Sequence, residues 1–154
     1  MKPSLILLSL TNLAVMAIAA VTGLLVEGQH GYLRHSLLGV LTGLFTCLVH
    51  VIVFVYFIVQ EKVFSQSVRL SGLEAGFAIE VRQIKLRVLL LSLCGIGSVH
   101  VVVGLGAVID IYLGASPHAV AAFACLALNA FLFVRHYMLV DRYGRTRDRA
   151  FGAG

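Results

Sequence analysis

The stretch His35–Gln60, HSLLGVLTGLFTCLVHVIVFVYFIVQ, contains no Asp, Glu, Lys or Arg and is long enough to cross a lipid bilayer as a helix. Three more charge-free runs of similar length occur at Pro3–Val26, Val88–Ile109 and Ile111–Val134. Their unbroken apolar character excludes the alternating pattern of a membrane β-barrel. With 60% hydrophobic and 12% charged residues, the 154-residue chain is predicted to be an all-α integral membrane protein, a four-helix bundle.

A single transmembrane domain is expected over residues 1–154, with spans at about 4–26, 35–60, 88–111 and 118–140. Between the second and third spans, residues 71–87 have apolar side chains at helical spacing after a capping-box pattern. This segment either extends the third helix beyond the membrane or forms a separate amphipathic helix on its surface. The sequence is compatible with both arrangements.

The basic residues predict the orientation of the bundle. Eleven of the twelve Lys and Arg residues lie at Lys2, in the connection 61–87 or in the segment 135–149. Because cytoplasmic segments are enriched in Lys and Arg, both termini and the long connection are expected in the cytoplasm, in an inner or cytoplasmic-type membrane. The net charge of +5 is then a consequence of topology, so we expect contact with lipid and no binding of nucleic acid.

Histidines are the candidate functional residues, since an imidazole in hydrocarbon is costly unless it has a partner. His50 and His100 are embedded within spans, whereas His35 and His118 begin spans at the expected outer face. Depth along the helices predicts the pair His35–His118. Depth alone does not decide between His100 and His136 as the partner of His50. The glycines around His100, and the charge of Arg135 beside His136 near the inner interface, favour the pair His50–His100, with His136 as a reserve partner. Facing imidazoles in a helical bundle are typical ligands of haem iron.

Glycines accompany these histidines. Gly43 lies on the face of His50, and Gly97 and Gly104 flank His100 on the third span. Such glycines indicate either close helix packing or a smooth trough for a flat macrocycle. Arg34, at the expected outer face, is a candidate partner for haem propionates or an ordinary interfacial anchor.

With four spans and histidines at positions 35, 50, 100 and 118, the chain resembles the small membrane-anchored b-type cytochromes, whose four-helix subunits bind haem. The resemblance implies one or two b haems held by paired histidines, with those histidines as the iron ligands. It also implies electron transfer within a larger complex that contains other membrane or peripheral redox subunits, with a quinone as a further partner. An electron-transfer subunit is thereby favoured over a stand-alone enzyme.

Two other functions remain open from the residues alone. A cofactor-free scaffold or accessory subunit would use the same histidines for hydrogen bonds between helices. A metal or proton translocator would use Glu27, His30, His35 and Asp110 at the outer mouth. The translocator is disfavoured because no acidic residue lies in the middle of a span, where ion pathways usually have one.

Overall fold

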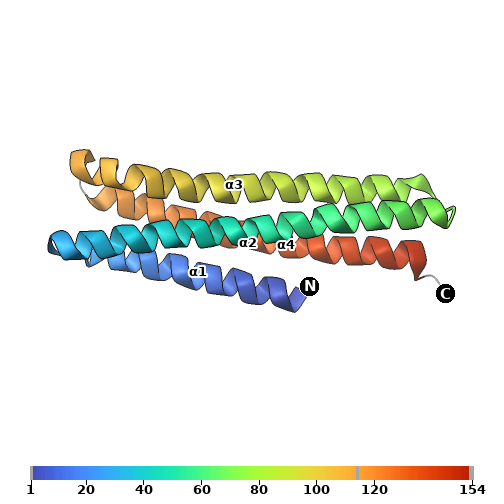
Figure 1. The fold of residues 1–154 in the computed structure, drawn as a ribbon, viewed down its shortest axis with the longest axis horizontal. Coiled ribbons are helices and arrows are strands. Elements are labelled where there is room, and N and C mark those ends of the chain that lie inside the picture. Colours follow the sequence, from blue (N-terminus) through green and yellow to red (C-terminus); the bar gives the residue numbers. More distant parts are fainter. Residues whose placement is uncertain (1, 114, 153–154) are drawn as a thin grey trace.

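In the computed structural model the chain forms four helices, α1 (Lys2–Leu24), α2 (Gly28–Leu70), α3 (Ala75–Leu113) and α4 (Ala115–Phe151) (Figure 1). The structure describes residues 2–113 and 115–152, and the description leaves out the side chains of residues 107–116. Each helix contains a segment long and apolar enough to cross a membrane. The protein is therefore all-α, and its length and composition are those of a multi-pass membrane protein.

The order of the helices around the bundle decides which side chains meet. α1 and α3 each pack against both α2 and α4, whereas α2 and α4 lie diagonally opposite one another and make few contacts. Short connections make consecutive helices antiparallel (Figure 1). Side chains of α2 and α4 that point toward the bundle axis therefore face each other across it.

The segment 71–87 extends the third helix. α3 is continuous from Ala75 to Leu113, so the alternative of a separate surface helix is not realised. The turn before it contains Gly72 with a φ of 62°, a left-handed conformation that a glycine adopts without strain. The three later helices thus extend well beyond their apolar runs.

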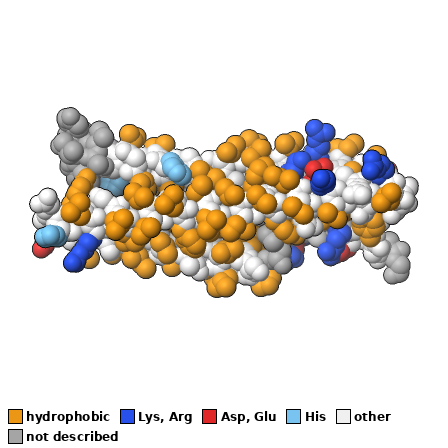
Figure 2. Space-filling view, viewed as in Figure 1, with side chains coloured by type: hydrophobic (Ala, Val, Ile, Leu, Met, Phe, Trp, Pro, Cys, Tyr) orange, Lys and Arg blue, Asp and Glu red, His pale blue; other side chains and the backbone are white. Residues whose placement is uncertain are grey.

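One end of the bundle consists of α2, α3 and α4 alone, because α1 begins part-way along it (Figure 1). Lys2 at the start of α1 pairs with Asp141 of α4, and α4 continues beyond that point to Phe151. Apolar side chains cover the middle of the molecule, while Lys and Arg gather mainly toward the three-helix end (Figure 2). We call this the basic end. Its core is aromatic and aliphatic and includes Phe57, Phe64, Val68, Val81, Ile84 and Tyr143.

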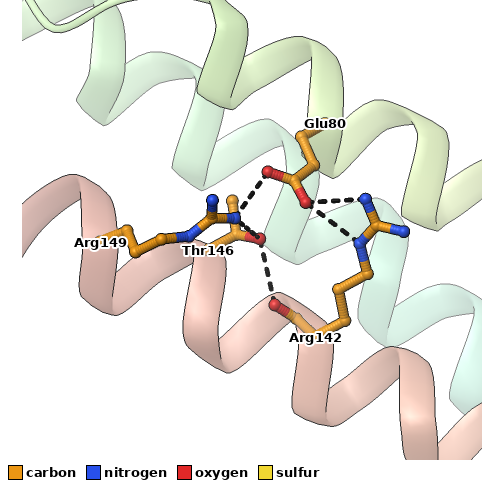
Figure 3. A network of polar contacts seen from close by, with 4 residues as sticks. All are labelled: Glu80, Arg142, Thr146 and Arg149. Atoms are coloured by element: carbon orange, nitrogen blue, oxygen red, sulfur yellow. Dashed lines mark hydrogen bonds and ion pairs between the residues drawn. The ribbon is translucent and has the colours of Figure 1, made fainter.

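Ion pairs join the helices at the basic end. Glu61 of α2 binds Lys85 of α3 at 2.8 Å. Glu80 of α3 accepts hydrogen bonds from Arg142, at 2.9 and 3.0 Å, and from Arg149, at 2.8 Å, both on α4 (Figure 3). These contacts fix the register of α3 against α2 and α4.

Replacing Glu80 with glutamine is expected to lower the free energy of unfolding by about 1 kcal/mol or less, because both arginines are substantially exposed and their charges are screened. The difference should shrink as salt is added. Denaturant titration of the purified protein in detergent, followed by circular dichroism, measures it. Glu74→Gln is the matched control, since Glu74 forms no ion pair with a described residue. Equal losses in both variants would contradict the prediction.

Candidate functional site: two histidine pairs across the bundle

His50 of α2 and His136 of α4 meet near the bundle axis, with ring centroids 5.4 Å apart and ring planes inclined by 65°. Both residues are 0% exposed. Phe133 stacks on His50 with a centroid distance of 4.9 Å and also lies beside His136. We call His50 and His136 the central pair. It is an imidazole pair sealed from solvent by apolar side chains.

His35 of α2 and His118 of α4 form a second pair at the end of the bundle opposite the basic end. Their ring centroids lie 6.0 Å apart and the planes are nearly perpendicular, at 77°. We call them the distal pair. By the rise of a helix, the two pairs are separated along the axis by roughly 22 Å on α2 and 27 Å on α4.

A cavity of about 190 Å³ adjoins the distal pair. Residues of all four helices line it, and several of them are small: Ala19 and Ala20 of α1, Gly39 of α2, Gly106 of α3, and Ala119 and Ala122 of α4. Such residues leave space between helices that larger side chains would fill. The distal pair is thus part of an apolar cavity, whereas the central pair is tightly packed.

Glycines of the neighbouring helices lie directly against three of the four imidazole rings. A methyl group at Gly23 would lie 2.7 Å from Cε1 of His35, and one at Gly106 would lie 2.5 Å from Cε1 of His118. A methyl group at Gly95 would lie 2.6 Å from Cε1 of His50. Because carbon atoms normally approach no closer than about 3.5 Å, any larger residue at these positions would push the ring away.

Ring nitrogens of three of these histidines lack a hydrogen-bond partner among the described residues. The Nδ1 atoms of His50, His118 and His136 are buried and have no hydrogen-bond partner within the described part of the chain. A buried polar atom without a partner is costly, so each instance in a structure calls for an explanation. A ligand atom that accepts a lone pair from these nitrogens is one such explanation.

The expected pairing of His50 with His100 is not formed. His100 lies on the exposed surface of α3, where Nδ1 is 2.8 Å from the carbonyl oxygen of Ile96 in the preceding turn. The buried stripe of α3 contains Ser92 and Val99, and one residue further turns His100 by about 100° toward the lipid-facing side.

His136, the reserve candidate, is the histidine that meets His50. The charge of Arg135 favours an interfacial location for its neighbour, but the two side chains point in different directions: Arg135 is exposed and His136 is buried. α4 also continues for another fifteen residues, to Phe151, so His136 lies well inside the bundle.

The glycines predicted to form a trough are divided between faces. Gly43 packs against Val99 of α3, as expected for close helix contact. Gly97 and Gly104 are exposed, and a methyl group at either position would meet no other atom within 4 Å. Contact between glycines and imidazoles was not predicted: Gly95 and Gly106 were considered only as packing residues of a scaffold. The sequence signal for these two was the spacing of Ser92, Gly95, Val99 and Gly106, which share one face of α3.

The residues named for other roles lie at the distal end. Arg34 is exposed, and so is His30. The side chain of Asp110 lies outside the described residues. Among the side chains that the structure describes, no group of three or more His, Cys, Asp or Glu is arranged to hold a metal ion.

Chemically, each pair offers two imidazoles and no carboxylate. A bare divalent cation bound there would keep most of its charge in an apolar interior, which is strongly unfavourable. A metal that brings its own anionic ligand avoids this cost. The two imidazoles of a pair, whose ring centroids lie 5.4 or 6.0 Å apart, would be the side chains that hold such a group.

Comparison with known proteins identifies no family for this chain. No protein-family model matches the chain, and no curated protein or solved structure is significantly similar to it.

Proposed function

We propose that the chain is a membrane b-type cytochrome that binds one haem at each histidine pair and passes electrons across the bilayer. The observation that supports it most strongly is that α2 and α4, on one diagonal of the bundle, each contribute two histidines that meet in two layers. A cofactor inserted along the bundle axis would be reached from both sides. Histidines that served only to join adjacent helices would not need this diagonal arrangement.

The side-chain chemistry of both pairs suits haem, although only the distal pair adjoins a cavity. The Nδ1 atoms of His50, His118 and His136 have no partner among the described residues and would supply lone pairs, and the glycines beside the rings hold them close to the axis. A tetrapyrrole is a dianion, so it neutralises the charge that two neutral imidazoles leave on iron. The cavity at the distal pair is smaller than the roughly 300 Å³ of common ligand pockets, so we expect the helices there to separate when haem enters.

A haem held by the two imidazoles of a pair would supply one-electron transfer and leave no site for oxygen. The chain itself has three tasks. His35, His118, His50 and His136 hold the metal from both sides. Phe133 and the surrounding aliphatic side chains exclude water from the central pair. The helices span the apolar layer and keep the two sites in line.

In this proposal the basic end faces the cytoplasm, because Lys and Arg are enriched on that side of a membrane. The partners are other membrane or peripheral redox subunits, since the electrons need a donor and an acceptor. A quinone is a candidate for either role. Arg34 and its neighbours at the distal end are candidates for binding the haem propionates.

A cofactor-free scaffold is the second candidate, and one contact favours it. Nε2 of His50 lies 3.0 Å from Oδ1 of Asn129 on α4, a hydrogen bond across the diagonal of the bundle that needs no cofactor. In that case the central pair would stabilise helix packing only.

Visible absorption spectra separate the two functions. The protein, purified in detergent after expression with added haem precursor, is measured oxidised and after reduction with dithionite. Sharp low-spin bands with about two haems per chain are expected for the cytochrome. His35→Ala and His118→Ala should each remove the distal haem while the helical content stays unchanged. A colourless, folded protein would reject the proposal in favour of the scaffold.

A further inference from the structure

The outer face of α3 has a regular row of exposed residues, which we call the outer seam. Its members follow one another at alternating spacings of four and three residues: Leu86, Leu90, Leu93, Gly97, His100 and Gly104. Residues at this spacing lie along one side of a helix, and parallel helices pack through such rows in left-handed pairs. α3 contacts α2 and α4 and lies diagonally opposite α1, so no described helix covers the outer seam.

His100 is the polar residue of the outer seam, and it lies well within the apolar span. By helical rise it is roughly 18 Å from Val88 and 14 Å from Ile109, the two ends of the charge-free run. Its Nδ1 lies 2.8 Å from the carbonyl oxygen of Ile96, and since a carbonyl only accepts, Nδ1 carries the proton. Nε2 then presents a lone pair that no described residue satisfies. Such an atom is costly in hydrocarbon, so a partner from outside the chain is expected.

A second copy of this chain provides a partner at the same depth. Both copies insert in the same orientation, because the same Lys and Arg residues direct them. A two-fold axis perpendicular to the membrane then places the two α3 helices side by side and parallel, so each residue of the outer seam meets its own equivalent. The ring of His100 therefore faces the same ring of the second copy.

Imidazole is suited to pairing with itself, because a neutral ring has one donor nitrogen and one acceptor nitrogen. One ring keeps its hydrogen bond to Ile96 and accepts at Nε2, while the other carries its proton on Nε2 and donates it. The glycines on either side favour this contact. A methyl group at Gly97 or Gly104 would meet no other atom within 4 Å, so neither glycine is required for packing within one copy. Their lack of a side chain lets two helices approach closely.

We infer that the protein forms a dimer in the membrane through the outer seam of α3, held in register by a hydrogen bond between the two His100 rings. In coiled coils, a single polar residue within the packed row fixes register and oligomeric state in this way. The inference does not depend on haem, because the outer seam lies on the side of α3 opposite to Gly95 and Gly106, the glycines that contact the histidine pairs.

Energy transfer between copies with donor and acceptor fluorophores on C-terminal tags measures the dimer, in phosphatidylcholine–phosphatidylglycerol vesicles at increasing dilution in lipid. His100→Leu should weaken the dimer about 3- to 30-fold, the range that one hydrogen bond between membrane helices provides. His100→Asn should weaken it less, because an amide also both donates and accepts. Leu105→Ala is the control and should change nothing, since Leu105 is exposed on the same helix but points about 140° away from His100.

Cysteine cross-linking tests which face of α3 is the interface. Leu93→Cys, in a chain with Cys47 and Cys94 replaced by alanine, should form a covalent dimer under mild oxidation, because its equivalent lies across the two-fold axis. The native Cys94, in a chain with only Cys47 replaced, is the matched control. It is also exposed but points about 100° away from Leu93, so it should remain uncross-linked. Cys125 is buried and stays in both chains.

A monomeric wild-type protein in these vesicles would overturn the inference, and the outer seam would then face lipid or a different subunit. Equal affinities of the wild type and His100→Leu, a His100→Asn dimer as weak as that of His100→Leu, or cross-linking through Cys94 in place of Leu93→Cys would also overturn it. Haem content is expected to stay unchanged in all these variants. A colourless protein that still dimerises through the outer seam would reject the cytochrome and keep the dimer.

Discussion

If the proposed function holds, replacing His136 with alanine is expected to remove about half of the bound haem, because a haem at the central pair would lose one of the two histidines that hold it. His136 is completely buried and faces His50 at 5.4 Å, and no other described imidazole lies close enough to substitute. The haem-to-protein ratio, from the absorbance of the extracted haem against protein concentration, measures the effect. Circular dichroism checks that the helices persist.

His100→Ala is the control for this prediction. His100 belongs to the same set of intramembrane histidines but lies exposed on α3. Its replacement should leave the haem content and both low-spin signals unchanged. A protein that loses haem on the loss of His100 and retains it on the loss of His136 would contradict the pairing.

Replacing Gly95 with alanine is expected to displace the ring of His50 and weaken or abolish the central site. A methyl group at this position would lie 2.6 Å from Cε1 of His50 and closer still to Nε2. Overpacking in a well-packed core costs about 1–3 kcal/mol. The gain from replacing a helical glycine with alanine is only about 0.5–1 kcal/mol, so the clash should dominate. Denaturant titration in detergent and haem content together measure the outcome.

Gly97→Ala separates the clash from the change in helix propensity. Gly97 lies on the same helix two residues away, and a methyl group there would meet no other atom within 4 Å. This variant should be as stable as the wild type or slightly more stable, with full haem content. If Gly95→Ala and Gly97→Ala behave alike, the ring of His50 does not rest on Gly95.

The helical membrane fold could be predicted from the sequence because hydrocarbon imposes a simple requirement. A backbone in lipid must satisfy its own hydrogen bonds, so a charge-free apolar run such as His35–Gln60 becomes a helix wherever it is long enough. The same reasoning identified imidazoles as functional candidates. A buried histidine is costly in any arrangement, so its importance does not depend on the fold.

The partners of these histidines could not be predicted from depth alone. His100 and His136 were separated from the level of His50 by similar distances, and the choice turned on the glycines beside one and the charge beside the other. Gly97 and Gly104 do share the face of His100, but that whole face of α3 is exposed and points away from His50. Arg135 is adjacent to His136 and therefore points about 100° away from it, so its charge says nothing about the face that meets His50.

The sequence by itself determined four apolar helices, their approximate limits and the histidines worth testing. These follow from the cost of placing unpaired backbone and side-chain polar groups in hydrocarbon. Only the tertiary structure decided that α2 and α4 lie on a diagonal, that His136 meets His50, and that Asn129 and Gly95 hold that ring. Those contacts join residues far apart in the chain. They depend on the rotation of each helix about its own axis, which packing against its neighbours fixes and local sequence does not.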